Sequence, residues 1–199
     1  MTRKTPDLAI VDLGYGNIGS IAIAFRRFGV EPRVTADPAA LAAASHVVLP
    51  GVGAAGFAMR RVHELDLAEP LRRLTNPVLG ICLGMQLLFD RSQEDNGVDC
   101  LRLIPGAVEK LDPAPDLPVP HMGWSRLSVR DEAVGLADGD YVYFAHSFAC
   151  PDGPATLASA DYGRAVPAVV RHANFLGAQF HPERSGPAGA RFLEAFLSQ

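Results

Sequence analysis

Residues 77–86 read Pro-Val-Leu-Gly-Ile-Cys-Leu-Gly-Met-Gln, an apolar run that ends at a cysteine between two glycines. The first five residues predict a buried strand, and the apolar residues after Cys82 predict a helix that extends to Phe89. Gly80 and Gly84 permit the strained strand-to-helix turn called a nucleophile elbow, where larger side chains would collide. A helix N-terminus favours the thiolate form of a cysteine. We therefore interpret Cys82 as a nucleophile, and the alternative is a small buried core residue.

The pattern of predicted helices and strands changes near residue 100. Before it, short apolar strands alternate with segments of helical periodicity, and after it most segments are strands separated by turns. Alternation of strands and helices is typical of a mainly parallel sheet covered on both faces. We expect an α/β doubly wound sheet flanked by helices, with antiparallel strands in the C-terminal half, in one domain over residues 1–199. Predicted strands are 8–11, 32–35, 46–49, 77–81, 107–111, 123–129, 141–144, 156–160, 165–171 and 174–180, and predicted helices are 18–28, 38–44, 54–63, 67–74, 83–89 and 188–197.

Composition and charge exclude several classes of protein. A hydrophobic fraction of 48% and a charged fraction of 20% are those of a globular chain rather than a disordered one. The net charge is −4 and basic residues form no long run, so we expect no nucleic-acid partner and no membrane partner. The apolar stretch 8–11 is broken at Asp12, too short for a signal peptide, and we expect a cytoplasmic protein. Three cysteines without C-x-x-C spacing predict neither a disulfide framework nor a zinc site, and we expect no metal and no cofactor.

A thiolate nucleophile needs a partner that delivers a proton to the leaving group. We favour His181, because it stands in the sequence His181-Pro182-Glu183. Residues two apart at the end of a strand point the same way, so Glu183 is placed to hold the tautomer of His181. The alternative is an ordinary surface turn. The six histidines available are His46, His63, His121, His146, His172 and His181.

Acyl chemistry on a carboxamide also needs hydrogen-bond donors for the developing oxyanion. The backbone N–H of Leu83, directly after the nucleophile, is one expected donor. The second is expected from the loop 50–54, Pro-Gly-Val-Gly-Ala, which follows the strand 46–49. Gly51 and Gly53 let this backbone approach a substrate or reorient a peptide, and the alternative is a plain glycine-rich turn.

A competing motif lies near the start of the chain. Residues 14–19, Gly-Tyr-Gly-Asn-Ile-Gly, follow the first strand, and Asp37 lies where a ribose-binding acid would stand. This pattern indicates a dinucleotide-binding protein. A chain of 199 residues leaves little room for a separate substrate domain. Dinucleotide binding would also leave the turn at Cys82 unexplained.

Three motifs together resemble the class I, triad-type glutamine amidotransferases: Gly80-Ile-Cys-Leu-Gly-Met-Gln86, Pro50-Gly-Val-Gly53 and Gln179-Phe-His-Pro-Glu183. Further stretches are similar to the glutaminase subunits of imidazole glycerol phosphate synthases, over nearly the whole chain. They are Gly16-Asn17, Leu103-Ile-Pro-Gly106, Pro120-His-Met-Gly-Trp124, Tyr143-Phe-Ala-His-Ser147, Tyr162-Gly163 and His181-Pro-Glu-Arg-Ser-Gly186.

This resemblance implies roles for individual residues. Cys82 attacks the side-chain amide of glutamine, His181 acts as base and acid, and Glu183 orients His181. The N–H groups of Val52 and Leu83 form the oxyanion hole. The implied contacts for the glutamine substrate are Gly51, Gly53, Gln86, Glu94, Ser147 and Phe148. The alternatives are a helix-surface position for Gln86 and a loop acid for Glu94.

The resemblance also implies a partner. The cyclase subunit, a (β/α)8 barrel, would form a heterodimer with this chain and use its ammonia to build an imidazole ring in histidine biosynthesis. Tyr15, Asn17, Trp124, Tyr143 and Arg184 match the implied interface, although Arg184 stands where such subunits usually have Lys. A core position is the alternative for the two aromatic residues at 124 and 143.

Two other classes of function remain open at this point. The first alternative is the glutaminase of another amidotransferase, such as the pyridoxal phosphate synthase type. The second is a non-catalytic dinucleotide-binding or regulatory subunit.

Overall fold

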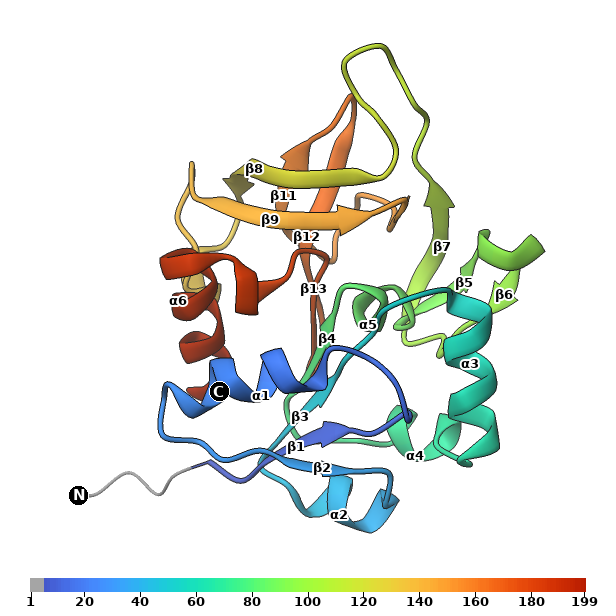
Figure 1. The fold of residues 1–199 in the computed structure, drawn as a ribbon, viewed down its shortest axis with the longest axis vertical. Helices are drawn as coiled ribbons and strands as arrows, with labels where there is room; N and C mark the ends of the chain where they lie inside the picture. Colours follow the sequence, from blue (N-terminus) through green and yellow to red (C-terminus); the bar gives the residue numbers. More distant parts are fainter. Residues whose placement is uncertain (1–5) are drawn as a thin grey trace.

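A nine-stranded mixed sheet crosses the computed structural model, which describes residues 6–199 (Figure 1). The strand order is β2-β1-β3-β4-β13-β12-β11-β8-β9. Neighbours from β2 to β13 pair in parallel, and those from β13 to β9 pair antiparallel. The strands are β2 (Arg33–Thr35), β1 (Leu8–Val11), β3 (His46–Leu49), β4 (Val78–Ile81), β13 (Phe175–Ala178), β12 (Ala165–His172), β11 (Thr156–Asp161), β8 (His121–Val129) and β9 (Tyr141–His146).

Helices cover both faces of the parallel part of this sheet (Figure 1). α1 (Ile18–Arg26) and α6 (Gly186–Leu197) lie on one face, while α2 (Pro38–Ala43), α3 (Ala55–Glu64) and α4 (Ala68–Arg72) lie on the other. Successive residues of β1 therefore alternate between two cores: Leu8 and Ile10 pack with α1 and α6, and Ala9 and Val11 pack with α3. The doubly wound α/β fold predicted from the sequence is confirmed.

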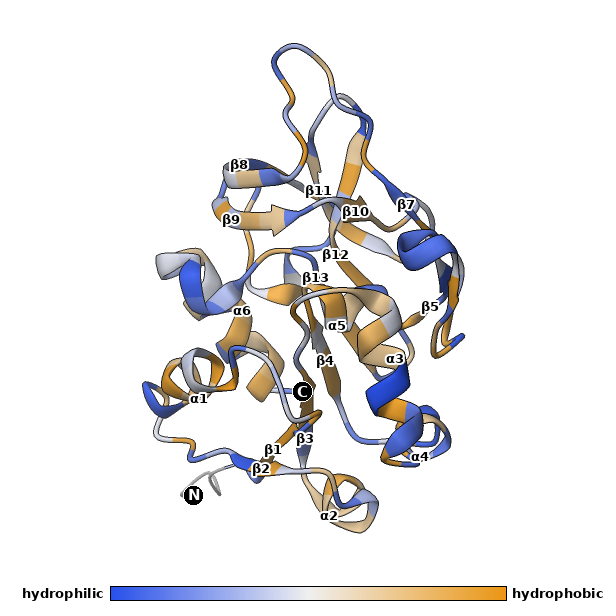
Figure 2. Ribbon diagram, turned by 45° about the vertical axis from the view of Figure 1, so that its right-hand side comes forward, coloured by the Kyte–Doolittle hydropathy of each residue, from blue (hydrophilic) through white to orange (hydrophobic). Residues whose placement is uncertain are grey.

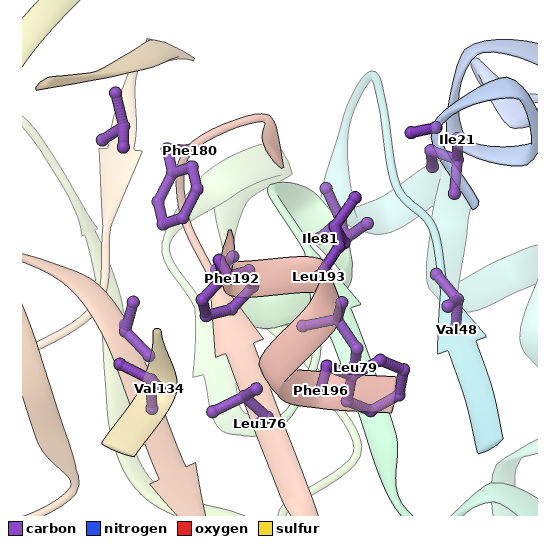
Figure 3. Packing of buried hydrophobic residues seen from close by; sticks show 14 of the residues in the cluster. Ile21, Val48, Leu79, Ile81, Val134, Leu176, Phe180, Phe192, Leu193 and Phe196 are labelled. Carbon is purple, nitrogen blue, oxygen red and sulfur yellow. The ribbon is translucent and has the colours of Figure 1, made fainter. Parts of the chain in front are cut away.

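Aromatic residues of α6 close the first of these cores (Figure 3). Phe192 and Phe196 are fully buried, and the Phe192 ring meets Phe180 edge-on with centroids 5.2 Å apart. Leu79 of β4 and Leu176 of β13 belong to the same cluster. Figure 2 shows hydrophobic residues on the central strands and hydrophilic residues on the outer parts of the helices. Burying several such side chains, each contributing about 1.5–3 kcal/mol, fixes α6 against the sheet.

A second sheet of four strands lies beside α5 in the order β10-β7-β5-β6. The predicted helix over residues 83–89 is wrong beyond its first turn: α5 spans only Leu83–Gln86, and Phe89 already begins a strand. The carbonyl groups that a longer helix would use accept hydrogen bonds from residues after 100 instead. The Leu101 N–H donates to the Leu87 carbonyl, and the Ile104 N–H donates to the Leu88 carbonyl. The strands are β10 (Phe148–Ala149), β7 (Ile104–Lys110), β5 (Phe89–Ser92) and β6 (Val98–Asp99).

The other predicted elements are present with boundaries shifted by a few residues. Asp37 caps α2, because its Oδ1 accepts the N–H of Ala39 at 3.0 Å. Asn17 occupies the N-cap of α1 without a side-chain capping bond. Short 3-10 helices η1 (Glu94–Asn96), η2 (Glu132–Val134) and η3 (Pro182–Arg184) were not predicted. None of the helices formed by residues 6–199 has both the length and the apolar character that crossing a membrane requires.

Three adjacent parallel strands bring the sequence motifs together. β3, β4 and β13 are neighbours, and their carboxyl ends lead to the loop 50–54, to Cys82 and to His181. Ligands of open α/β sheets bind at this edge, outside the carboxyl ends of the strands. The topology therefore places the candidate nucleophile between the other two motifs.

Glycines allow the backbone to pass closely at this point. A Cβ on Gly80 would lie 2.5 Å from the carbonyl oxygen of Gly84, and a Cβ on Gly84 would overlap the carbonyl oxygen of Leu49 at the end of β3. The first turn of α5 thus rests directly on the neighbouring strand.

We expect Gly84→Ala to lower the free energy of unfolding by about 3 kcal/mol, because the added methyl group meets backbone that cannot move aside. Gly19→Ala is the matched control: nothing lies within 4 Å of a Cβ there, and alanine at this exposed position of α1 should raise stability by up to about 1 kcal/mol. Urea unfolding of both variants measures this, and equal stabilities would contradict the assigned packing.

Candidate active site

Cys82 sits in a strained backbone turn between β4 and α5. Its φ of 53° and ψ of −111° are rare for a residue other than glycine. The Cys82 N–H donates to the carbonyl oxygen of Ala178 in β13 at 2.7 Å, which ties the turn to the strand that leads to His181. As the residue after Cys82 and the first of α5, Leu83 carries an N–H without an intrahelical acceptor. The turn has the geometry of the predicted nucleophile elbow.

A cavity of about 380 Å³ opens in front of Cys82. Its lining residues come from segments that are far apart in the sequence, and most of the predicted site residues are among them. Pro120, Met122, Ala145 and His146 also line it, although the sequence predicted no role for them in the site. The predicted residues that line the cavity are Val52, Gly53, Cys82, Leu83, Gln86, Glu94, Ser147, Phe148 and His181.

His181 and Glu183 are in contact, as predicted. Nδ1 of His181 lies 3.0 Å from Oε1 of Glu183, whose side chain is almost fully buried. The expected reason for this contact, strand alternation, is wrong: β13 ends at Ala178, and the 3-10 turn η3 brings the two side chains together. Ser185 Oγ holds the turn, because it donates to the His181 carbonyl at 2.7 Å and accepts the Tyr143 N–H at 3.0 Å.

The protonation of His181 follows from its partners. Burial alone would lower the pKa of this imidazole, but hydrogen bonds and charge interactions with Cys82 and Glu183 outweigh burial and raise its pKa to about 10. The ring is therefore protonated at neutral pH. An imidazolium beside a sulfur atom is the arrangement in which a cysteine acts as a thiolate nucleophile.

The loop 50–54 is held at both ends. A Cβ on Gly51 would overlap the N–H of Gly84, so this glycine supports the turn and does not line the cavity. Beyond the loop, the N–H of Ala55 donates to Oε2 of Glu94 at 2.7 Å, and that of Gly56 donates to Oδ2 of Asp95 at 3.1 Å. Glu94 thus lines the cavity and also caps α3.

Gln86 is a buried residue rather than a helix-surface one. Its Nε2 donates to the Phe148 carbonyl at 2.8 Å and to Oε1 of Gln179 at 3.0 Å. Nε2 of Gln179 lies 3.8 Å from Sγ of Cys82. Gln179 was predicted only as part of its motif, and its amide lies between the Gln86 amide and Sγ of Cys82.

The predicted interface residues lie at the surface or partly buried. Trp124 is 55% exposed, which excludes the alternative that it is a core residue. Its ring meets that of Tyr143 edge-on at 6.1 Å, and the Arg184 guanidinium lies 4.5 Å from the centroid of the same Tyr143 ring. Tyr15 packs edge-on against Phe57 at 4.8 Å, and burial raises the pKa of its hydroxyl to about 12. Asn17 is exposed.

The glycine motif at residues 14–19 forms the loop before α1 and the first residues of that helix. The Gly14 N–H donates to Oδ1 of Asp12 at 2.8 Å, and Arg61 donates to the Leu13 carbonyl at 3.0 Å beside it. Asp37, the candidate ribose ligand, caps α2. Within residues 6–199, no group of three His, Cys, Asp or Glu side chains is arranged to hold a metal ion.

The other two cysteines are buried and do not line the cavity. Burial raises the pKa of Cys100 to about 11 and that of Cys150 well above its usual range. Neither thiol has the electrostatic setting of a nucleophile.

Comparison with known proteins agrees with this geometry. Residues 9–199 match the family described as glutamine amidotransferase class-I. The chain is 48% identical over 194 residues to the imidazole glycerol phosphate synthase subunit HisH of Xylella fastidiosa, with 96% of each chain covered. It is 49% identical over 194 residues to the subunit of the same name from Xanthomonas campestris pv. campestris, again with 96% of each chain covered.

Solved structures show the same fold at lower identity. A putative GMP synthase subunit from Thermoplasma acidophilum superposes with a TM-score of 0.75 at 19% identity, covering 98% of this chain and 94% of that one. A glutamine amidotransferase superposes with a TM-score of 0.74 at 20% identity, covering 96% and 97% of the two chains.

We expect Glu183→Gln to destabilise the protein by about 2 kcal/mol near pH 6 and by less as the pH rises toward 10. The raised pKa of His181 contributes stability that is fully present below its unfolded value near 6.5 and is lost as the pH rises through about 10. Urea unfolding at several pH values measures the difference between wild type and variant. Glu194→Gln, on the exposed side of α6, is the control and should show a constant difference. A constant difference for Glu183→Gln would contradict the assigned ion pair.

Proposed function

Since the chain belongs to the glutamine amidotransferase class-I family, we propose that it is the glutaminase subunit of an imidazole glycerol phosphate synthase and acts as a single amidotransferase domain. One observation carries this proposal most strongly: three adjacent strands place an elbow cysteine, a His–Glu pair and a glycine-rich loop around one cavity. The enzyme hydrolyses glutamine to glutamate and ammonia.

The reaction proceeds through a covalent thioester. Sγ of Cys82 attacks the side-chain carbonyl carbon of glutamine, and the developing oxyanion is held by the N–H groups of Leu83 and Val52. His181 donates its proton to the departing nitrogen, which leaves as ammonia. His181 then takes a proton from water, which attacks the thioester, releases glutamate and restores the thiolate. Glu183 keeps Nδ1 of His181 protonated and Nε2 directed to the reaction throughout.

The cavity also offers groups for the amino-acid end of glutamine. Glu94 presents a carboxylate to the substrate ammonium group, while Ser147 and Phe148 supply backbone groups. Gln86, which also lines the cavity, donates to the Phe148 carbonyl and holds it in place. Gly53, with a φ of 81°, gives the loop beside the reacting carbon a conformation that other residues rarely adopt.

Ammonia released into water at neutral pH becomes mostly ammonium, which is not a nucleophile. Direct transfer to a partner avoids this loss, and the relatives are named as subunits of a synthase. We assign the partner as the cyclase subunit, a (β/α)8 barrel, which forms a heterodimer with this chain for histidine biosynthesis. The surface formed by Tyr15, Asn17, Trp124, Tyr143 and Arg184 is its docking site, with a cytoplasmic location as the expected setting.

Cys82→Ala should abolish glutamine hydrolysis in the complex, to less than about one thousandth of the wild-type rate, because no other group forms the thioester. Release of glutamate and ammonia measures this, with circular dichroism to check the fold. Cys100→Ala, a buried thiol outside the cavity, is the control and should keep its activity. Hydrolysis by Cys82→Ala at the wild-type rate would refute the assigned nucleophile.

Trp124→Ala should raise the dissociation constant for the cyclase subunit by about tenfold or more, since exposed tryptophans that become buried at interfaces contribute strongly to affinity. Titration calorimetry measures this constant. Val34→Ala on β2, at the opposite end of the sheet, is also partly exposed and should leave it unchanged. Equal constants for the two variants would place the interface elsewhere.

A further inference from the structure

Two buried histidines beside the cavity take no part in the mechanism above. His121 on β8 and His146 on β9 are direct register partners, 2% and 6% exposed. Nδ1 of His121 lies 3.1 Å from Nε2 of His146. The His121 ring is stacked between the rings of Phe144 and Tyr162, with centroids 4.6 and 3.9 Å away. Both rings therefore have fixed positions.

The contacts of the pair assign the protons. Nδ1 of His146 lies 2.8 Å from the carbonyl oxygen of Phe148, which only accepts, so this nitrogen donates. Nε2 of a neutral His146 then accepts from Nδ1 of His121. Nε2 of His121 in turn accepts from the hydroxyl of Ser125, 2.7 Å away. The hydrogen bonds thus run in one direction, from Ser125 to Phe148.

Charge and burial keep both rings neutral. Burial lowers the pKa of His121 to about 4. The pKa of His146 is also lowered to about 4, because burial and the charges of His121, His181 and Arg164 outweigh the hydrogen bond to the Phe148 carbonyl. A proton on Nε2 of His146 would also face the N–H of His121 at 3.1 Å. The chain of bonds depends on two neutral imidazoles.

The Phe148 carbonyl links this chain to the catalytic groups. It accepts from Nδ1 of His146 and from Nε2 of Gln86, each at 2.8 Å. Gln86 also donates to Gln179, whose amide reaches Cys82. Movement of this one carbonyl would therefore disturb the wall of the glutamine site.

We propose that His121 and His146, each in the Nδ1–H tautomer, are positioning residues that hold the Phe148 carbonyl and, through it, the Gln86 amide for glutamine binding. The inference rests on the proposed function, because it concerns the same cavity. It assigns the pair to substrate binding and not to proton transfer, since neither imidazole faces the reacting groups through a hydrogen bond.

The first test needs no activity. Side-chain ¹H–¹⁵N correlation spectra of the wild-type protein report the tautomer and charge of each imidazole. We expect two histidines, identified from the spectra of His121→Asn and His146→Asn, to be neutral Nδ1–H tautomers from pH 8 down to pH 5. A cationic ring or an Nε2–H tautomer at either position would overturn the proposal.

The second test compares two amides at position 146 in the complex with the cyclase subunit. His146→Asn places an amide nitrogen where Nδ1 stands and keeps the donor to Phe148. His146→Gln carries its amide farther out, where Nε2 stands, and loses that donor. We expect the KM for glutamine to stay within about twofold of wild type for the first and to rise about tenfold for the second, with kcat of both within about threefold.

The control is His172→Asn on the exposed end of β12, which should change neither constant. Equal KM values for the two variants at position 146 would overturn the proposal, and so would a fall confined to kcat. A wild-type complex that does not hydrolyse glutamine would instead refute the proposed function, while the spectra would still decide the tautomers.

Discussion

The site depends on backbone passing against backbone where α5 begins. Gly80, Gly84 and Gly51 each lack the Cβ that would collide there, so the first turn of α5 lies against β3. This contact holds Cys82 in a conformation that the residue would not adopt alone. The strain is balanced by buried strands on both sides, through the Cys82 N–H bond to Ala178 among others. The loop 50–54 takes its position from the same contact.

The local sequence was sufficient to predict those elements that depend on neighbouring residues alone. The apolar runs and the glycines around Cys82 predicted the strand, the turn and their place in a doubly wound sheet. The length of α5 was not predictable, because the loop after residue 100 captures the carbonyls of Leu87 and Leu88. The capping of α3 by Asp95 and the pairing of His121 with His146 likewise depend on long-range register. No periodicity in the sequence signals such contacts.

Three histidines around one cavity show how partners decide protonation. Burial lowers the pKa of His121, His146 and His181 alike. Of the three, only His181 has both a carboxylate and the sulfur of Cys82 as partners, and it alone is protonated at neutral pH. Its positive charge in turn disfavours a proton on His146. The site therefore contains one cationic imidazole and two neutral ones, although the three side chains are of the same type.

The three cysteines have different surroundings, so only one of them is expected to react with a thiol reagent in the folded protein. Cys100 and Cys150 are closed off in the core, and burial keeps them as unreactive thiols. Cys82 opens to the cavity beside an imidazolium. An alkylating reagent applied to the folded protein therefore consumes one equivalent per intact site. A preparation that takes up more contains unfolded chains, so simple titration of reactive sulfur reports the fraction of competent enzyme.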